Sequence, residues 1–256
     1  MFFKKKVVGW GRRASSEKPR IPDGIRVYAI GDVHGRLDLL DDMLEQIEAE
    51  IAVRGEAQNQ LVVLGDIIDR GPDSRRVIER LQNYLLDGTS PVLICGNHEE
   101  MLLRLLSGEQ GLLNNWLSFG GAEFVQSYGI DTRKITSMTE DAAIAVVRGA
   151  IPRSHREYLE ASIDTVKIGD FLFVHAGIRP NVDLSIQSQM DLRWIRQPFL
   201  DDNSDHGMVV VHGHSISADV DQRRNRIGLD TGAYRSGRLS AIGLEGDQRW
   251  FLEATA

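Results

Sequence analysis

Five short apolar runs along the chain each lead directly into a cluster of glycine and metal-binding residue types. Apolar runs of this length, bounded by glycine, are typical of strands that are buried on both faces of a sheet. In open α/β sheets, ligands bind beyond the carboxyl ends of such strands. We therefore expect the polar clusters to meet at one common rim. The runs and clusters are 28–30 before Gly31-Asp32-Val33-His34-Gly35, 61–64 before Gly65-Asp66-Ile67-Ile68-Asp69-Arg70-Gly71, 92–95 before Gly96-Asn97-His98-Glu99, 171–174 before His175-Ala176-Gly177, and 209–211 before His212-Gly213-His214.

Amphipathic segments follow the first three clusters and predict helices. Apolar residues recur at helical spacing over 37–47, among many acidic residues. A second helix is expected over 72–88, because the segment starts with Pro-Asp-Ser and ends near a glycine, and a third over 98–108. The alternation of strands and helices indicates an α/β fold.

The alternation stops over 109–156, where we expect a mostly helical cap insertion that either covers one edge of the sheet or lines the substrate cleft. Beyond the last cluster, short strands are expected over 226–232, 238–245 and 248–252, with Gly246-Asp247 as a tight hairpin turn. These strands predict a second, more antiparallel sheet packed on the first.

The composition narrows the class of protein. At 256 residues, one domain with an insertion fits as well as two domains. The formal net charge of -7 argues against a general nucleic-acid binder, which usually presents a basic face. The single cysteine, Cys95, excludes an internal disulfide framework and agrees with the cytoplasm, where we expect the protein to reside.

The first 24 residues are basic and lack the apolar centre of a secretory signal. We expect residues 1–24 to form a mobile tail. The alternative is weak contact with an anionic membrane surface, because Phe2, Phe3 and Trp10 accompany the basic residues.

The clusters supply carboxylate, amide and imidazole groups without thiolates, a set that suits divalent hydrolytic metals. One Asp-x-His sequence is weak evidence, but five such clusters, each after an apolar run, indicate a shared site. Two metal ions about 3.5–4 Å apart can ionise a bridging water and neutralise charge on a phosphoryl group. We therefore expect two divalent metal ions, with manganese preferred over iron, zinc or magnesium.

The motifs Gly-Asp-x-His-Gly, Gly-Asp-x-x-Asp-Arg-Gly and Gly-Asn-His-Glu, followed by two later histidines, together resemble the phosphoprotein phosphatase branch of the calcineurin-like metallophosphoesterases. The motifs span residues 31–214, most of the chain. The resemblance implies an α/β fold in which a β-sandwich of two mixed sheets is flanked by helices, with a helical cap insertion and two metals at the carboxyl rim. We expect the domain to cover residues 25–256.

The resemblance also implies a role for each residue of the motifs. His98 resembles the general acid that protonates the leaving alkoxide, and Asp69 resembles the residue that orients it. Arg70 resembles a phosphate clamp, because a guanidinium can bind two phosphoryl oxygens at once, and Arg196 is the expected second clamp. The implied metal ligands are Asp32 and His34 for the first metal, Asp66 as the bridge, and Asn97, His175 and His214 for the second metal.

Four further residues of metal-binding type are expected to have structural roles. His155 and His206 lie in polar stretches without ligand spacing, so they are predicted at the surface. His212 is expected to pack or to support a ligand, although it shares a strand face with His214. Glu99 is expected to support the loop or to start a helix.

The expected substrate is a phosphorylated protein or a small phosphoester. The Gly-Asn-His-Glu form is similar to bacterial and phage protein phosphatases, which favours a serine/threonine protein phosphatase in which a metal-bound hydroxide attacks phosphorus in line. Members of the family that act on proteins usually carry an arginine directly before this motif, whereas this chain has Cys95 at that position. Segments 229–233 and 237–239 resemble the symmetrical diadenosine tetraphosphate hydrolases, the alternative function. A catalytically silent phosphate-binding protein is a third hypothesis, which the complete acid and arginine set disfavours. The oligomeric state stays open.

Overall fold

The computed structural model describes residues 18–256, so most of the predicted basic tail lies outside the described residues. The last residues of that predicted tail belong to the fold instead. Ile21 is fully buried, and its N–H donates to the carbonyl oxygen of Gly246 over 2.8 Å. The folded chain therefore begins before residue 25. Within residues 18–256, no helix is both long enough and apolar enough to span a bilayer.

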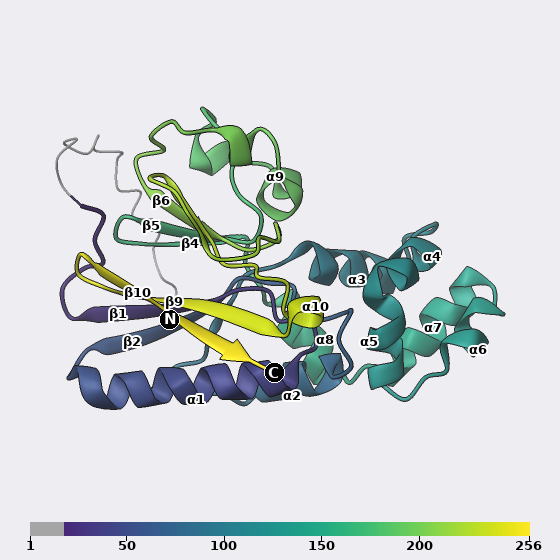
Figure 1. Ribbon diagram of the computed structural model, residues 1–256. Helices are drawn as coiled ribbons and strands as arrows, with labels where there is room; N and C mark the ends of the chain where they lie inside the picture. The colour runs from purple at the N-terminus through teal and green to yellow at the C-terminus, as the bar shows by residue number, and fades with distance from the viewer. Residues whose placement is uncertain (1–17) are drawn as a thin grey trace, which may run out of the picture.

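Two five-stranded sheets pack face to face at the centre of the molecule (Figure 1). The first has the order β10-β9-β1-β2-β3, in which β1, β2 and β3 are parallel. The second has the order β4-β5-β6-β8-β7, with the three central strands parallel and both edge strands antiparallel. The strands are β1 Ile25–Ile30, β2 Gln58–Val63, β3 Val92–Leu93, β4 Thr165–Ile168, β5 Phe171–Val174, β6 Val209–His212, β7 Asp221–Gln222, β8 Arg226–Gly228, β9 Arg238–Glu245 and β10 Gln248–Thr255.

The three carboxyl-terminal strands were predicted to lie in the second sheet, and this prediction is wrong for two of them. Only β8 joins the second sheet, whereas β9 pairs antiparallel with β1, and β10 pairs with β9. The reason is that β9 is apolar on both faces. Its Ile242 and Leu244 face the second sheet, while Leu239 and Ala241 face the helices, so this strand suits the interior of a sheet. The hairpin turn after it is confirmed, with φ of 53° at Gly246.

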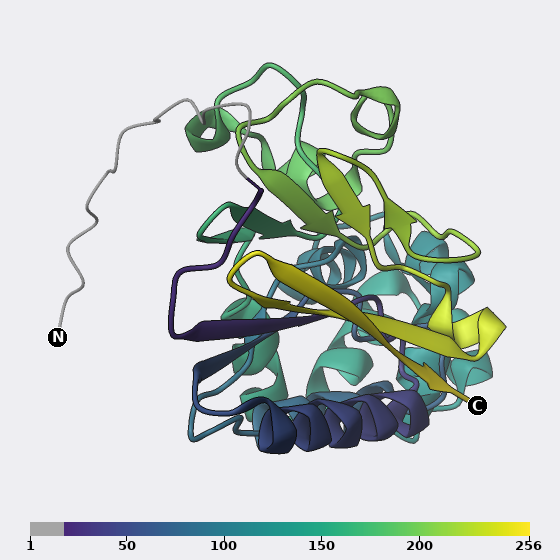
Figure 2. The same cartoon turned by 60° about the vertical axis from the view of Figure 1, so that its left-hand side comes forward.

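Alternation of side chains along β1 divides its apolar residues between two cores. In β1, Val27 and Ala29 point between the sheets, where they pack with Phe173 of β5, whereas Tyr28 and Ile30 point toward the helices. Helix α1 covers this outer face of the first sheet, and α9 lies over the second sheet (Figures 1 and 2). The result is a sandwich flanked by helices, as predicted.

The three predicted helices are present, but the second is shorter than expected. It ends at Gln82 rather than near residue 88, and beyond it Leu86 and Thr89 exchange backbone hydrogen bonds of 2.9 and 2.8 Å that turn the chain. The third ends as predicted at Gly108, whose φ of 94° is left-handed, a conformation that glycine adopts without a side-chain clash. The helices are α1 Leu37–Arg54, α2 Ser74–Gln82 and α3 Asn97–Ser107.

The segment 109–156 forms short helices that extend away from the sandwich beside α3 (Figure 1). A π-helical turn, η1, joins the first two of them, and its Phe119 and Gly120 have non-helical backbone angles. The segment is helical, as expected, and its limits as an insertion stay a prediction. The elements are α4 Leu113–Trp116, η1 Leu117–Gly121, α5 Ala122–Ser127, α6 Thr132–Thr136, α7 Glu140–Ala150 and α8 Arg153–Glu160, and the later ones η2 Leu184–Ile186, α9 Gln189–Trp194, η3 Phe199–Asp201 and α10 Ala233–Ser236.

Candidate two-metal site

The polar clusters of both sheets lie together where their strands end. The N–H of His34 donates to the carbonyl oxygen of Asp66 over 2.8 Å, which joins the loops after β1 and β2. The N–H of His98 donates to Oδ1 of Asp66 over 3.0 Å. From the second sheet, the N–H of His214 lies 3.1 Å from both carboxylate oxygens of Asp32. The strand ends of the two sheets therefore share one site.

Sharp backbone turns aim these side chains inward. The φ angles of Asp66, Asp69 and His214 are 48°, 69° and 63°, in the left-handed region. Such conformations cost non-glycine residues about 1–3 kcal/mol each, and they cluster at functional sites. Gly213 permits the close approach beside them, because a Cβ there would lie 2.0 Å from Oδ1 of Asp32.

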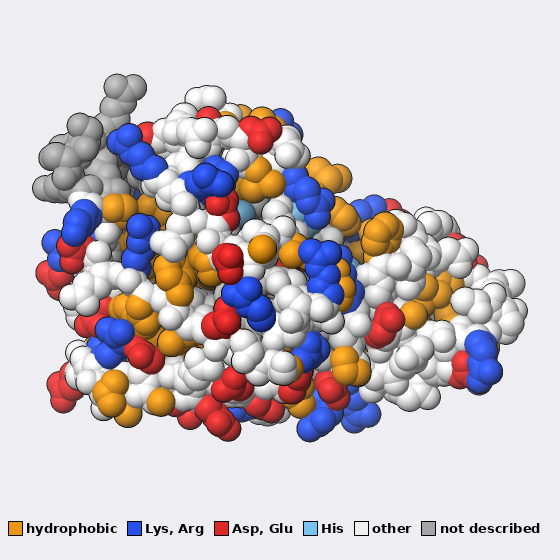
Figure 3. All heavy atoms as spheres, in the orientation of Figure 1, with side chains coloured by type: hydrophobic (Ala, Val, Ile, Leu, Met, Phe, Trp, Pro, Cys, Tyr) orange, Lys and Arg blue, Asp and Glu red, His pale blue; other side chains and the backbone are white. Residues whose placement is uncertain are grey.

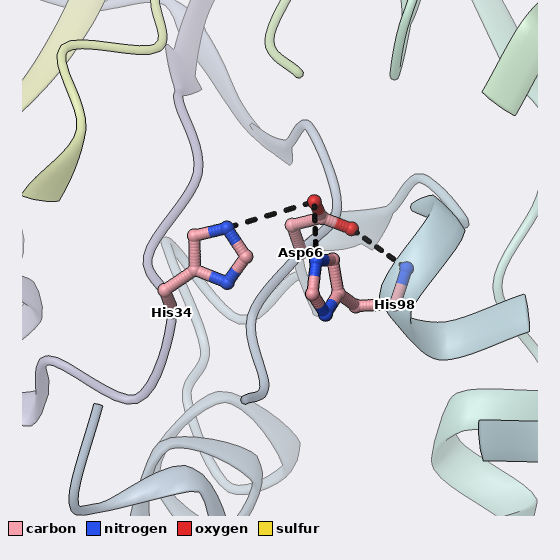
Figure 4. Close-up of side chains that lie close together, drawn as sticks. All are labelled: His34, Asp66 and His98. Atoms are coloured by element: carbon pink, nitrogen blue, oxygen red, sulfur yellow. Dashed lines mark hydrogen bonds and ion pairs between the residues drawn. The ribbon is translucent and has the colours of Figure 1, made fainter. Parts of the chain in front are cut away.

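The carboxylate of Asp66 lies at the centre of the site. Its Oδ2 is 3.6 Å from Nε2 of His34 and 3.9 Å from Nε2 of His98 (Figure 4). The same oxygen is 3.4 Å from Nε2 of His175. Two groups share this carboxylate, one with His34 and His98 and one with His175 and His214, and within each group the candidate ligand atoms lie within 4.8 Å of one another. Asp66 is thus in a position from which one carboxylate can reach two cations.

Backbone carbonyls orient two of the histidines. Nδ1 of His34 lies 2.9 Å from the carbonyl oxygen of Ile68, and Nδ1 of His175 lies 2.8 Å from that of Leu64. A proton on each Nδ1 satisfies these contacts and leaves the Nε2 lone pair for a metal. The amide oxygen of Asn97 lies 2.9 Å from Nε2 of His175, so it faces the same point.

The electrostatics of the site fit bound cations. Burial and the nearby charge of Asp230 raise the pKa of Asp32 well above its usual range, and burial raises the pKa of Asp230 to about 6. A cation between these carboxylates and Asp66 would relieve the repulsion. Burial and nearby His175 lower the pKa of His214 to about 2, so its imidazole is neutral, and its Nε2 is without a hydrogen-bond partner among residues 18–256. The donor set therefore fits two divalent metals.

His98 and Asp69 form a buried pair beside this centre. Nδ1 of His98 lies 2.7 Å from Oδ2 of Asp69, whose carboxylate is fully buried. Burial alone lowers the pKa of His98, but the charge of Asp66 and the hydrogen bond to Asp69 outweigh it, so the pKa is raised. A raised pKa is the direction that suits a general acid.

Two arginines predicted as clamps line one cavity of about 450 Å³ above the candidate ligands. Nη1 of Arg70 lies 3.0 Å from Nε2 of His34, and its Nη2 lies 2.9 Å from Nε2 of His98. Arg196, just beyond α9, lines the same cavity. Figure 3 shows histidine atoms between Lys and Arg side chains on this face of the molecule.

Several residues of this cavity were not predicted. The insertion contributes three residues to the lining, so of its two predicted roles, the structure supports the one at the cleft. Asp230, beside the candidate ligands, was also missed, although it lies in the Leu-Asp-Thr-Gly segment that the sequence singled out. Three sequence signals could have pointed to the other residues: the aromatic residues of 116–128, the position of Trp194 two residues before Arg196, and the segment of α10 after Leu-Asp-Thr-Gly. The unpredicted lining residues discussed below are Trp116, Phe119, Trp194, Tyr234 and Arg235.

Glu99 holds the two metal-site loops together. Its fully buried carboxylate accepts hydrogen bonds from the backbone N–H groups of Asp66, Ile67 and Gly96, over 2.7, 2.9 and 2.9 Å. This geometry agrees with the predicted support of the loop.

Two histidines predicted at the surface are buried instead. His155 is 4% exposed, with Nδ1 2.8 Å from the hydroxyl of Tyr128, and His206 is 9% exposed and stacks on Phe199. Aromatic rings outside each polar stretch pack on both histidines, which is why their polar local sequence misled the prediction. His212 packs edge-on against Phe199, in agreement with its expected packing role.

Comparison with known proteins places this geometry in a family. The family model described as calcineurin-like phosphoesterase matches residues 25–238. Serine/threonine-protein phosphatase 2 of Escherichia coli is 26% identical over 228 residues, which cover 84% of this chain and 90% of that protein. The symmetrical bis(5'-nucleosyl)-tetraphosphatase of Nitrosococcus oceani is 34% identical over 86 residues, or 34% of this chain and 28% of that protein.

The similarity to curated relatives is partial in several cases. The chain spans about two fifths of the length of two other curated relatives that it matches. Among solved structures, a protein proposed to be a diadenosine tetraphosphatase superposes with a TM-score of 0.62 at 20% identity, covering 93% of this chain and 99% of that one. That likeness shows the fold. Because the family model matches residues 25–238, which are most of the chain, this chain belongs to the calcineurin-like phosphoesterase family.

Proposed function

We propose that the protein is a dimetal-dependent phosphomonoesterase. The observation that carries the proposal is the position of Asp66, whose carboxylate is shared by two groups of candidate ligands. Two bound divalent metals would supply an activated water as nucleophile and neutralise charge on the phosphoryl group. Manganese is the expected metal. The residues that would hold the metals are Asp32, His34, Asp66, Asn97, His175 and His214.

The chain's own residues would handle the phosphate and the leaving group. With its Nδ1 held by Asp69 and Arg70 drawn onto the phosphate, His98, which lines the cavity, would carry a proton on Nε2 and give it to the leaving oxygen. Arg70 and Arg196 would bind the phosphoryl oxygens. Their charges stabilise the negative charge that develops there during attack in line with the leaving group.

The preferred substrate is phosphoserine or phosphothreonine in a protein. The Gly-Asn-His-Glu motif supports this, as does the similarity to serine/threonine-protein phosphatase 2 along nearly the whole chain. Phe119, which lines the cavity, is 59% exposed, so its ring is accessible to a side chain of a peptide substrate.

The second candidate is a symmetrical dinucleoside tetraphosphate hydrolase. The cavity lining favours it, since Arg235 adds a third guanidinium and the rings of Phe119 and Trp194 line the same cavity, where they could stack on a base. The ring of Tyr234 also lines it, with the guanidinium of Arg70 4.8 Å from its centroid. Within residues 18–256, Arg235 forms no salt bridge with a carboxylate. Its guanidinium would therefore be free to bind a further phosphate group.

One comparison tests both candidates. The manganese-loaded protein is assayed on p-nitrophenyl phosphate, on a phosphothreonine peptide and on diadenosine tetraphosphate. We expect turnover of the first two, with the peptide faster than the dinucleotide. A large excess for the dinucleotide would reject the preferred substrate, and no turnover of any ester by a folded, metal-loaded sample would reject the enzyme proposal altogether.

Arg70→Ala is expected to slow p-nitrophenyl phosphate and an alkyl phosphate by similar factors, on the order of 10²-fold, because it removes charge stabilisation at oxygens common to both. Steady-state kinetics on the two esters measure this. Arg133→Ala, on the 90% exposed side chain of α6, is the control and should change neither rate. A loss confined to the alkyl ester would assign Arg70 to the leaving group instead.

A further inference from the structure

The insertion reaches into the proposed acid pair through one indole. Trp116, at the end of α4, is 1% exposed, and its Nε1–H donates to Oδ2 of Asp69 over 3.1 Å. The same oxygen accepts from Nδ1 of His98 over 2.7 Å. The other oxygen, Oδ1, is buried without a hydrogen-bond partner among residues 18–256. Two donors on one oxygen thus set the orientation of this carboxylate.

The turn that follows Trp116, η1, contacts Arg70, which is the residue after Asp69. The N–H of Arg70 donates to the carbonyl oxygen of Gly120 over 3.1 Å, and a Cβ at Gly120 would lie 2.6 Å from that nitrogen. A Cβ at Gly121 would lie 2.4 Å from the ring of Trp116. The insertion therefore fits closely on Asp69 and Arg70, whose φ angles of 69° and 65° need such support.

Packing alone does not account for this contact. Trp116 also packs edge-on against Phe124, 5.7 Å away between ring centroids, and a purely apolar residue could fill that space. An indole adds one polar N–H, and here it is used on the carboxylate that holds His98. Hydrogen bonds to an ionised group are the stronger ones, and a buried carboxylate that loses a donor is poorly compensated.

We propose that Trp116 is a positioning residue of the reaction: through Asp69 it holds His98 in line with the leaving oxygen. The insertion then contributes to catalysis itself, besides lining the cleft. This inference rests on the proposed function, in which His98 is the general acid.

The test removes the indole N–H and little else. Trp116→Phe, and the replacement of Trp116 by β-(3-benzothienyl)alanine, which keeps the shape of indole but has sulfur in place of N–H, are assayed with manganese on phenethyl phosphate and on p-nitrophenyl phosphate. We expect kcat on the alkyl ester to fall about 10-fold, the worth of one hydrogen bond to a charged group, with a loss below about 3-fold on the activated ester, whose leaving group needs no proton.

Phe124→Leu is the matched control, because it disturbs the same packing without touching Asp69. It should leave the ratio of the two rates unchanged even if it lowers the melting temperature. The isosteric variant keeps the test decisive if Trp116→Phe fails to fold. Equal slowing of both esters by the isostere, or no slowing, would overturn the inference.

A double substitution separates this inference from the proposed function. In a His98→Asn background, Trp116→Phe should add no further loss on the alkyl ester, because both changes remove one function. A full further loss there would show that Trp116 acts elsewhere. If His98→Asn itself slows both esters equally, the proposed acid is wrong, whatever Trp116 does.

Discussion

Asp66→Asn is expected to lower turnover by more than about 100-fold and to weaken the binding of two metals, while the protein stays folded. Changes to residues that merely support metal ligands already cost about 10–100-fold, and an amide replaces the shared negative charge of the carboxylate by one neutral oxygen. The fold should persist, because the amide oxygen can still accept the N–H of His98, as Oδ1 does now. Calorimetric titration with manganese and circular dichroism measure the two effects.

Asp23→Asn is the control for this prediction. Asp23 is 88% exposed at the other end of the sandwich, beside Arg20, so the same chemical change there should leave metal stoichiometry and turnover intact. Binding of two manganese ions by Asp66→Asn with unaltered affinity would show that Asp66 is no bridge.

His98→Asn is expected to slow unactivated esters by on the order of 10²–10⁴, the usual contribution of a positioned general acid. The loss on p-nitrophenyl phosphate should be smaller, because p-nitrophenolate leaves without a proton. The hydrogen bond from Nδ1 to Asp69 makes this residue the acid in our proposal, although its Nε2 is also 3.9 Å from Oδ2 of Asp66. Rates on a series of esters with different leaving groups provide the measurement.

The two roles open to His98 give different outcomes. If His98 is the acid, its loss makes the rate depend more steeply on the pKa of the leaving group, and two metals still bind. If His98 is instead a metal ligand, its loss slows all esters alike and lowers the manganese content of the purified protein, which elemental analysis detects. The second outcome would assign His98 to the first metal together with His34 and Asp66, a grouping that the distances also allow.

Local sequence was sufficient for the parts of this protein that depend on short-range chemistry. Apolar runs flanked by glycine predicted β1, β2, β5 and β6, and helical spacing predicted α1 and α3, because burial and capping leave a periodic signal. Since parallel strands present their carboxyl ends on one side, the runs also indicated that Asp66, His175 and the other motif residues would meet.

Local sequence was insufficient where a partner distant in the chain decides the outcome. β9 looks like a strand of either sheet, and only its pairing with β1 settles which. His155 stands in a polar stretch and is buried because Tyr128 and its neighbours cover it.

The sequence by itself determined which chemical groups this protein brings to its candidate site, since the motifs contain the proposed ligands, the proposed acid and the first proposed clamp. Only the tertiary structure decided what surrounds them. Trp116 lies 47 residues from Asp69 in the chain, and no periodicity or motif connects them. Asp230 and Arg235 reach the site from a third segment. Hydrogen bonds and charge interactions between such segments depend on distances in space, which only packing of the sandwich against the insertion establishes.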